Sequence, residues 1–117
     1  MSLLIVDDHP NFRSFARLLL SAEGFDVAGE AEDGESAIEA VEQLHPDVVL
    51  LDVQLPGIDG FEVARRLAED PDGPQVVLTS SREARDYGSR LSGSPATGFL
   101  PKMELSGAAL GAIIAAA

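Results

Sequence analysis

Short apolar runs alternate along the chain with longer stretches in which apolar residues recur every three or four positions. A short run of β-branched and aliphatic residues is typical of a strand buried on both faces, whereas the longer spacing is typical of a helix with one buried face. The predicted strands cover residues 3–6, 25–30, 47–52, 75–79 and 97–100. The predicted helices carry their apolar residues between 12 and 22, 37 and 44, 61 and 68, 82 and 91, and 104 and 117.

Because strands and helices alternate about five times with short loops, we predict an α/β fold in which a parallel sheet is covered by helices on both faces. Gly24 is expected just after the first helix, where a left-handed residue is common. Pro46 should stop the second helix and bias the residue before it toward extended geometry. Asp59 followed by Glu62 resembles an acidic capping box for the third helix. We predict a single domain over residues 1–117.

The fourth predicted helix, after Ser81, is the weakest element of this pattern. Tyr87 and Leu91 are its few apolar anchors, and the loop at 92–97 is rich in small residues. An element with few apolar contacts is easily displaced, so this region suits a surface that changes conformation.

Composition and charge narrow the class of protein. The 117 residues are 45% hydrophobic and include no cysteine, so we expect a folded domain without disulfides or thiolate metal sites. No apolar run has membrane length and the amino-terminal residues do not resemble a signal peptide, so we expect a cytoplasmic protein. The formal net charge of −12 opposes direct binding to nucleic acid or to anionic membranes.

Polar residues follow the predicted strands at the points where these end. Asp7 and Asp8 follow the first strand, Asp52 ends the third, Thr79 ends the fourth and Lys102 follows the fifth. The carboxyl ends of parallel strands meet at one edge of a sheet, where ligands bind. Three carboxylates in one pocket repel each other, so at least one pKa should rise unless a cation compensates. Hard oxygen ligands with open positions suit Mg²⁺, which also binds phosphate oxygens.

These residue types also suit phosphoryl transfer. Lys102 carries a compact positive charge that pairs with a carboxylate or a phosphoryl oxygen, and the Thr79 hydroxyl can donate to a second phosphoryl oxygen. Asp52 is then available to attack phosphorus and form an aspartyl phosphate.

Taken singly, each residue has an ordinary structural explanation. Asp7 and Asp8 could be helix N-cap acids, and Asp52 could be a cap or turn residue. Thr79 could be a β-branched strand residue, and a loop lysine such as Lys102 is usually solvated. The joint placement of all five residues at strand ends is what favours a phosphoryl-transfer site.

The whole chain resembles the receiver domain of two-component response regulators, of the type that precedes a helix-turn-helix output domain or stands alone. The residues that carry the resemblance are Asp7-Asp8, Asp52 with Leu55-Pro56-Gly57 and Asp59-Gly60 behind it, Thr79, and Lys102 at the end of 98–102. The resemblance implies a flavodoxin-like, doubly wound five-stranded parallel sheet of order 2-1-3-4-5.

The resemblance also implies roles for individual residues. Asp8 and Asp52 would bind Mg²⁺ directly, Asp7 would do so directly or through water, and the backbone carbonyl of Gln54 would be a further ligand. Asp52 would receive a phosphoryl group from a sensor histidine kinase or a histidine phosphotransfer protein. The family analogy also allows a homodimer through the face near the last helix.

Thr79 and Lys102 would hold the phosphoryl group, and Phe99 occupies the position of the family's switch aromatic residue. When Thr79 moves toward the phosphoryl group, Phe99 would turn inward and reshape the face around the last helix, which would control an output domain or partner. The chain departs from the family at two points: Met103 rather than proline follows Lys102, and Phe99 lacks the hydroxyl of the commoner tyrosine.

Other interpretations remain open at the level of sequence. A flavin- or nucleotide-binding module would need a phosphate cradle after the first strand, where this chain has carboxylates. A phosphohydrolase would typically need a second acid at position 54, which is Gln54. A degenerate receiver that acts only as a phosphorylation-independent interaction module is the remaining alternative. His9 is expected to be a polar residue at the rim of the site, and His45 to be exposed to solvent.

Overall fold

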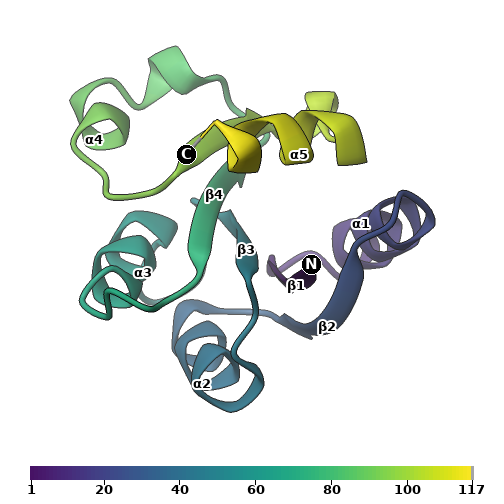
Figure 1. Cartoon of the computed structure of the whole chain (residues 1–117). Helices are drawn as coiled ribbons and strands as arrows, with labels where there is room; N and C mark the ends of the chain where they lie inside the picture. The colour runs from purple at the N-terminus through teal and green to yellow at the C-terminus, as the bar shows by residue number, and fades with distance from the viewer. Residues whose placement is uncertain (117) are drawn as a thin grey trace.

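A computed structural model describes residues 1–116 as one five-stranded parallel sheet with helices on both faces (Figure 1). The strand order is β2-β1-β3-β4-β5, and all four neighbouring pairs are parallel. This confirms the predicted flavodoxin-like topology. The strands are β1 (Ser2–Val6), β2 (Asp26–Ala31), β3 (Val48–Asp52), β4 (Gln75–Ser80) and β5 (Gly98–Pro101).

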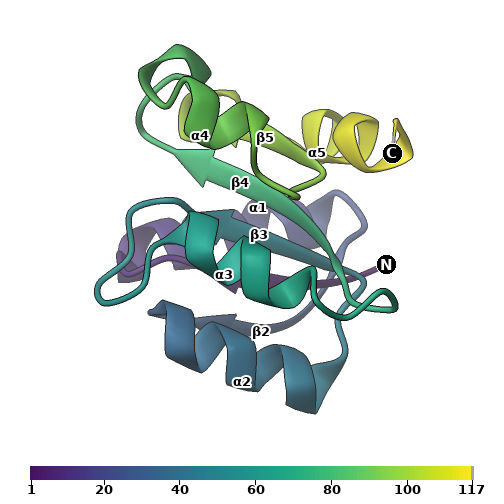
Figure 2. The ribbon, with the colours of Figure 1, turned by 90° about the vertical axis from the view of Figure 1, so that its left-hand side faces the viewer.

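The helices divide between the two faces of the sheet. The α-helices are α1 (Pro10–Ala22), α2 (Gly34–Leu44), α3 (Gly60–Leu67), α4 (Ser89–Ser92) and α5 (Gly107–Ala115), and two short 3₁₀ helices are η1 (Ala84–Asp86) and η2 (Lys102–Glu104). Figure 1 shows α1 and α5 on one face, with α2 and α3 on the other. Figure 2 views the molecule from the side of α2 and α3, with α4 beside β4 and β5.

The central strands are buried on both sides, as their unbroken apolar runs predict. All five residues of β3 are buried. Val49 and Leu51 pack in the core under α2 and α3, whereas Val48 and Leu50 pack in the core under α1 and α5. Alternate side chains of a strand point to opposite faces, so one apolar run supplies both cores. Asp52 is therefore the last residue of a rigid, fully enclosed strand.

Several helix ends follow their local sequence signals. Gly24 has φ +100° after α1, as expected for the residue beyond a helix. His45 is exposed but not extended: it has φ 47° and ψ 55°, and its amide still donates to the Val41 carbonyl. The proline after His45 disfavours the right-handed helical conformation, and the left-handed one ends the helix while keeping this hydrogen bond. The predicted extended geometry at His45 is therefore wrong.

Only one of the two hydrogen bonds of the predicted capping box forms at the start of α3. The Asp59 carboxylate accepts a hydrogen bond from the Glu62 amide at 3.0 Å. The Glu62 side chain does not return to the cap but pairs with Arg65 and Arg66 at 2.7 and 2.8 Å. Two guanidinium groups within reach outcompete a single backbone amide for this carboxylate.

The helix predicted after Ser81 is broken. It consists of η1, a turn at Tyr87 and Gly88, and the single helical turn α4, and none of the residues of η1 or α4 is buried. Gly88 has φ 54° and ψ −126°, outside the helical region, and divides the segment. With so little apolar surface to bury, a continuous helix gains no packing energy that would oppose this break.

The last helix starts later than predicted. Residues 102–104 form η2, and α5 begins at Gly107, where the Ser106 hydroxyl accepts from the Ala109 amide at 3.0 Å. The predicted end of this helix, Ala117, lies outside the described residues. Across residues 1–116, no helix combines the length and the apolar character that crossing a membrane requires.

Candidate functional site

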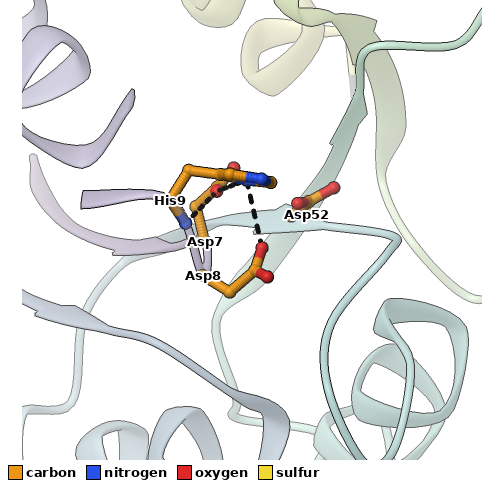
Figure 3. Close-up of side chains that lie close together, drawn as sticks. All are labelled: Asp7, Asp8, His9 and Asp52. Atoms are coloured by element: carbon orange, nitrogen blue, oxygen red, sulfur yellow. Dashed lines mark hydrogen bonds and ion pairs between the residues drawn. The ribbon is translucent and has the colours of Figure 1, made fainter. Parts of the chain in front are cut away.

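Acidic side chains from two neighbouring strands meet at the carboxyl edge of the sheet (Figure 3). Asp7 and Asp8 lie in the loop after β1, and Asp52 ends β3. Asp7 is fully buried and Asp52 is 3% exposed, whereas Asp8 lies at the solvent-facing rim. One ligand atom from each of Asp7, Asp8, His9 and Asp52 lies within 4.8 Å of the others. The structure thus brings together the three carboxylates that the sequence placed at strand ends.

Two cationic or polar groups fix Asp7. The His9 amide donates to Asp7 Oδ1 at 2.8 Å, and His9 Nδ1 lies 3.0 Å from the same oxygen and 3.1 Å from Asp8 Oδ1. The other oxygen, Asp7 Oδ2, accepts no hydrogen bond of regular geometry but lies 2.6 Å from Lys102 Nζ. His9 is 68% exposed, so it is a rim residue as expected, but it also bridges both acids.

Asp52 is an acid of this site whose pKa is raised. Burial raises its pKa from 3.8 to about 6, and the nearby Asp7 carboxylate adds to this rise. Lys102 Nζ, 3.5 Å from Asp52 Oδ2, and the Gln54 amide, which donates to Asp52 Oδ1 at 3.2 Å, oppose the rise. At least one pKa of the site is raised, as expected, but burial contributes more to this rise than repulsion from Asp7 does.

Lys102 reaches the acids from η2 and lies near the other oxygen of Asp7 than His9 does. Its ammonium nitrogen lies 4.4 Å from the centroid of the Phe12 ring of α1, and its side chain is only 17% exposed. A partly desolvated ammonium over an aromatic face gains cation–π attraction. The apolar spacing between residues 12 and 22 predicted a helix but not this contact, because no spacing rule links positions 12 and 102.

Thr79 is placed beside Asp52, but its hydroxyl is engaged elsewhere. The two residues are paired across β3 and β4, and Thr79 is fully buried. Thr79 Oγ1 donates to the Leu100 carbonyl of β5 at 2.6 Å. The hydroxyl must leave this carbonyl before it can donate to a group on Asp52.

Phe99 is half-buried on β5 and packs on the side of α3 and α4. Its ring centroid lies 6.0 Å from that of Tyr87, at an interplanar angle of 62°. This edge-on arrangement is a favourable aromatic contact. Phe99 therefore connects the strand that carries the Leu100 carbonyl with the broken helical segment.

Gly60 holds the strand end of Asp52 against α3. Its amide donates to the Val53 carbonyl at 2.8 Å. A Cβ atom at position 60 would overlap the Asp52 carbonyl oxygen and lie 2.8 Å from Val53 Cα. From the sequence, Gly60 is noted only as part of the Asp59-Gly60 pair that follows Asp52. A glycine next to the cap residue was the available signal, but the close approach itself depends on the fold.

The donor set fits a hard divalent cation. Carboxylate oxygens converge from Asp7, Asp8 and Asp52, and Asp7 Oδ2 is buried without a regular hydrogen bond. Mg²⁺ prefers such oxygen donors, and it commonly binds through a few carboxylates while keeping several waters. The exposed rim at Asp8 leaves room for those waters.

Comparisons with known proteins agree with this geometry. The sequence model of the response regulator receiver domain family matches residues 3–114. The response regulator GacA of Pseudomonas aeruginosa is 37% identical over 103 residues, which are 87% of this chain and 48% of that protein. The DNA-binding transcriptional activator EvgA of Escherichia coli K12 is 33% identical over 104 residues, 89% of this chain and 51% of that protein. The chain spans about half the length of these curated relatives.

Solved structures share the whole fold. The signal receiver domain of NarL from Mycobacterium tuberculosis superposes with a TM-score of 0.83 at 34% identity, covering 97% of this chain and 95% of that one. The response regulator domain of CheB from Thermotoga maritima has a TM-score of 0.84 at 22% identity and supports the fold alone.

Proposed function

The chain belongs to the response regulator receiver domain family, and from that premise we propose that it accepts a phosphoryl group on Asp52. The observation that supports this most is the placement of Asp52, which is almost fully buried beside two other acids and 3.5 Å from Lys102. An aspartate with only a structural role at a strand end would not require a lysine and a second buried acid beside it. We also propose that residues 1–117 act as one receiver domain.

In the proposed transfer, an Asp52 carboxylate oxygen attacks the phosphorus atom of a phosphohistidine on the donor protein. The P–N bond breaks, and the imidazole nitrogen leaves with the bonding electron pair. The pKa of about 6 leaves Asp52 mostly ionised at neutral pH, with a more basic oxygen than an ordinary aspartate has. Water later hydrolyses the acyl phosphate and returns the carboxylate, so the domain acts as a switch rather than as an enzyme with its own substrate.

We propose that Asp8, Asp52 and the Gln54 backbone carbonyl hold Mg²⁺, with Asp7 binding it directly or through water. When bound, the cation supplies positive charge beside the transferring oxygens, which is the main catalytic need in phosphoryl transfer. Lys102, already 2.6 Å from Asp7 and 3.5 Å from Asp52, would turn its ammonium toward a phosphoryl oxygen. Thr79 would exchange the Leu100 carbonyl for a second phosphoryl oxygen.

The proposed partners follow from the family and the relatives. A sensor histidine kinase or a histidine phosphotransfer protein would supply the phosphoryl group, in the cytoplasm. GacA and EvgA are named as a response regulator and a DNA-binding activator, so an output that controls transcription is proposed for this chain as well. The net charge of −12 argues that any DNA contact belongs to an output domain and not to these residues. A homodimer through the face near α5 is a further proposal by family analogy.

Intact-mass spectrometry tests the phosphoacceptor directly. The protein is incubated with acetyl phosphate with and without Mg²⁺, and one phosphate adduct is expected only with the metal. Asp52→Asn should abolish the adduct, whereas Asp26→Asn, which changes an exposed aspartate of β2, should leave it intact. An undiminished adduct in Asp52→Asn would refute the assignment, and catalytic turnover of phosphoesters would favour a phosphohydrolase.

A further inference from the structure

The sole tyrosine of the chain occupies the break in the fourth helical segment. Tyr87 follows η1, and its ring lies between two phenylalanines that come from different elements. The ring centroid of Phe61 in α3 is 5.5 Å away at an interplanar angle of 71°, and that of Phe99 in β5 is 6.0 Å away at 62°. Tyr87 therefore joins α3, β5 and the segment 81–93 through aromatic contacts.

The hydroxyl of Tyr87 joins the same segment to β4. Tyr87 Oη lies 2.6 Å from the hydroxyl oxygen of Ser80, which is fully buried and directly follows Thr79. The Arg82 amide also donates to Ser80 Oγ, at 3.0 Å. Ser80 is thus the point at which the strand end and the segment 81–93 are hydrogen-bonded to each other.

Few other contacts hold this segment in place. The residues of η1 and α4 are not buried, and Leu91 is only half-buried. Arg90 lies with its guanidinium carbon 4.5 Å from the Phe61 ring centroid and pairs with Asp59, both at the solvent-facing side. Exposed ion pairs contribute little to stability, so the half-buried side chains of Tyr87 and Leu91 supply most of the apolar attachment.

Both attachments of Tyr87 lie next to one hydrogen bond. Thr79 Oγ1 donates to the Leu100 carbonyl, Ser80 is the residue after Thr79, and Phe99 is the residue before Leu100. Breaking the Thr79–Leu100 bond therefore disturbs the two strand positions on which Tyr87 rests. Packed side chains respond to such a disturbance by moving between discrete arrangements rather than by deforming smoothly.

We propose that Tyr87 is the positioning residue that transmits the state of Asp52 to segment 81–93, and that it supplies the switch hydroxyl that Phe99 lacks. With Thr79 bonded to Leu100, Tyr87 is held by Ser80 and by Phe99, and the segment stays against β4. When the Thr79 hydroxyl turns to a phosphoryl group, the Leu100 carbonyl is released, Phe99 shifts, and the Tyr87–Ser80 hydrogen bond breaks. This inference rests on the proposed function, because Asp52 must first be phosphorylated.

The single tyrosine allows a direct spectroscopic test. Protein labelled with 3-fluorotyrosine gives one ¹⁹F resonance, recorded before and after treatment with acetyl phosphate and Mg²⁺, with the adduct confirmed by mass. We expect the resonance to move on phosphorylation in the wild type. In a protein that carries the adduct, an unmoved resonance would overturn the proposal. Absence of the adduct itself would refute the proposed function instead, so the two failures are distinguishable.

Amide hydrogen exchange in segment 81–93 tests whether the Tyr87 hydroxyl holds this segment in place. Tyr87→Phe keeps the ring, so the fold and the phosphate adduct should persist. Exchange in the unphosphorylated variant should be about five-fold faster, the factor that corresponds to one net hydrogen bond. Phosphorylation should then change that exchange less than it does in the wild type. Unchanged exchange in Tyr87→Phe, with a wild-type response to phosphorylation, would overturn the proposal.

Two further variants separate coupling from a merely structural role. Ser80→Ala removes the same hydrogen bond from its other partner and also the bond from the Arg82 amide, so its own effect on exchange should be at least that of Tyr87→Phe. Adding Tyr87→Phe to Ser80→Ala should therefore raise the exchange rate no further. Ser81→Ala, an exposed neighbour without a hydrogen bond to Tyr87, is the control and should behave as wild type. Additive effects of Ser80→Ala and Tyr87→Phe would show that the two hydroxyls act independently and would refute the proposal.

Discussion

Replacing Asp52 by asparagine should stabilise the folded protein at neutral pH. Asp52 is nearly fully buried, and burial together with Asp7 raises its pKa from 3.8 to about 6. The folded state therefore binds a proton more tightly than the unfolded chain does, and stability falls as the pH rises from 4 through 6. An asparagine side chain keeps the shape of the aspartate without its charge, so this loss should disappear in Asp52→Asn.

The size of the effect follows from the displaced pKa. A rise from 3.8 to about 6 corresponds to at most about 3 kcal/mol of stability lost by ionising Asp52 in the fold. Solvent at the open rim near Asp8 screens part of this repulsion, so we expect a gain of about 1 to 3 kcal/mol in Asp52→Asn at pH 7.5. Lys102 keeps its partner Asp7 at 2.6 Å, so the variant does not leave this partly buried ammonium without a counter-ion.

The predicted gain in stability of Asp52→Asn is checked by urea unfolding in EDTA at several pH values between 4 and 7.5. The difference in unfolding free energy between Asp52→Asn and wild type should be largest at pH 7.5 and should vanish toward pH 4. Asp26→Asn, at an exposed position of β2, controls for the change in net charge and should show no such trend. A destabilised Asp52→Asn protein, or a difference that does not depend on pH, would refute the argument from burial and repulsion.

Three further predictions follow from the same site. Mg²⁺ at ten times its Kd should add about 1.4 kcal/mol to the unfolding free energy and raise Tm by a few degrees, and Asp52→Asn should lose most of this effect. Lys102→Ala should still gain a phosphate adduct but lose the accompanying conformational change, measured by amide exchange around Phe99. Gly60→Ala should destabilise the fold by about 1 to 3 kcal/mol in urea unfolding, because its Cβ would overlap the Asp52 carbonyl.

Each of these has a matched comparison. Ca²⁺ in place of Mg²⁺ tests whether the stabilisation needs a small cation. A Tm that changes with neither cation would count against the metal site. A normal conformational response in Lys102→Ala would remove that residue from its assigned role. Gly111→Ala controls for the loss of a glycine, since nothing lies within 4 Å of a Cβ there, and a Gly60→Ala protein as stable as this control would contradict the close approach.

The sequence determined the order of the elements and the chemistry at the strand ends. Apolar runs such as Val48 to Leu51 are encoded residue by residue, and a run of that kind is buried on both faces only in a covered parallel sheet. Once the sheet is parallel, Asp7, Asp52 and Lys102 must meet at its carboxyl edge, because each follows a strand. Hence these residues could be predicted as one candidate site without coordinates.

The tertiary structure alone decided how those residues are held. The Thr79 hydroxyl donates to Leu100, Lys102 lies over Phe12, and Tyr87 meets Ser80, all between residues that share no local pattern. Such contacts depend on strand register and on which rotamers fit once the cores are packed. The break at Gly88 has the same origin: a segment with little apolar surface takes its shape from the neighbours that it contacts rather than from its own periodicity.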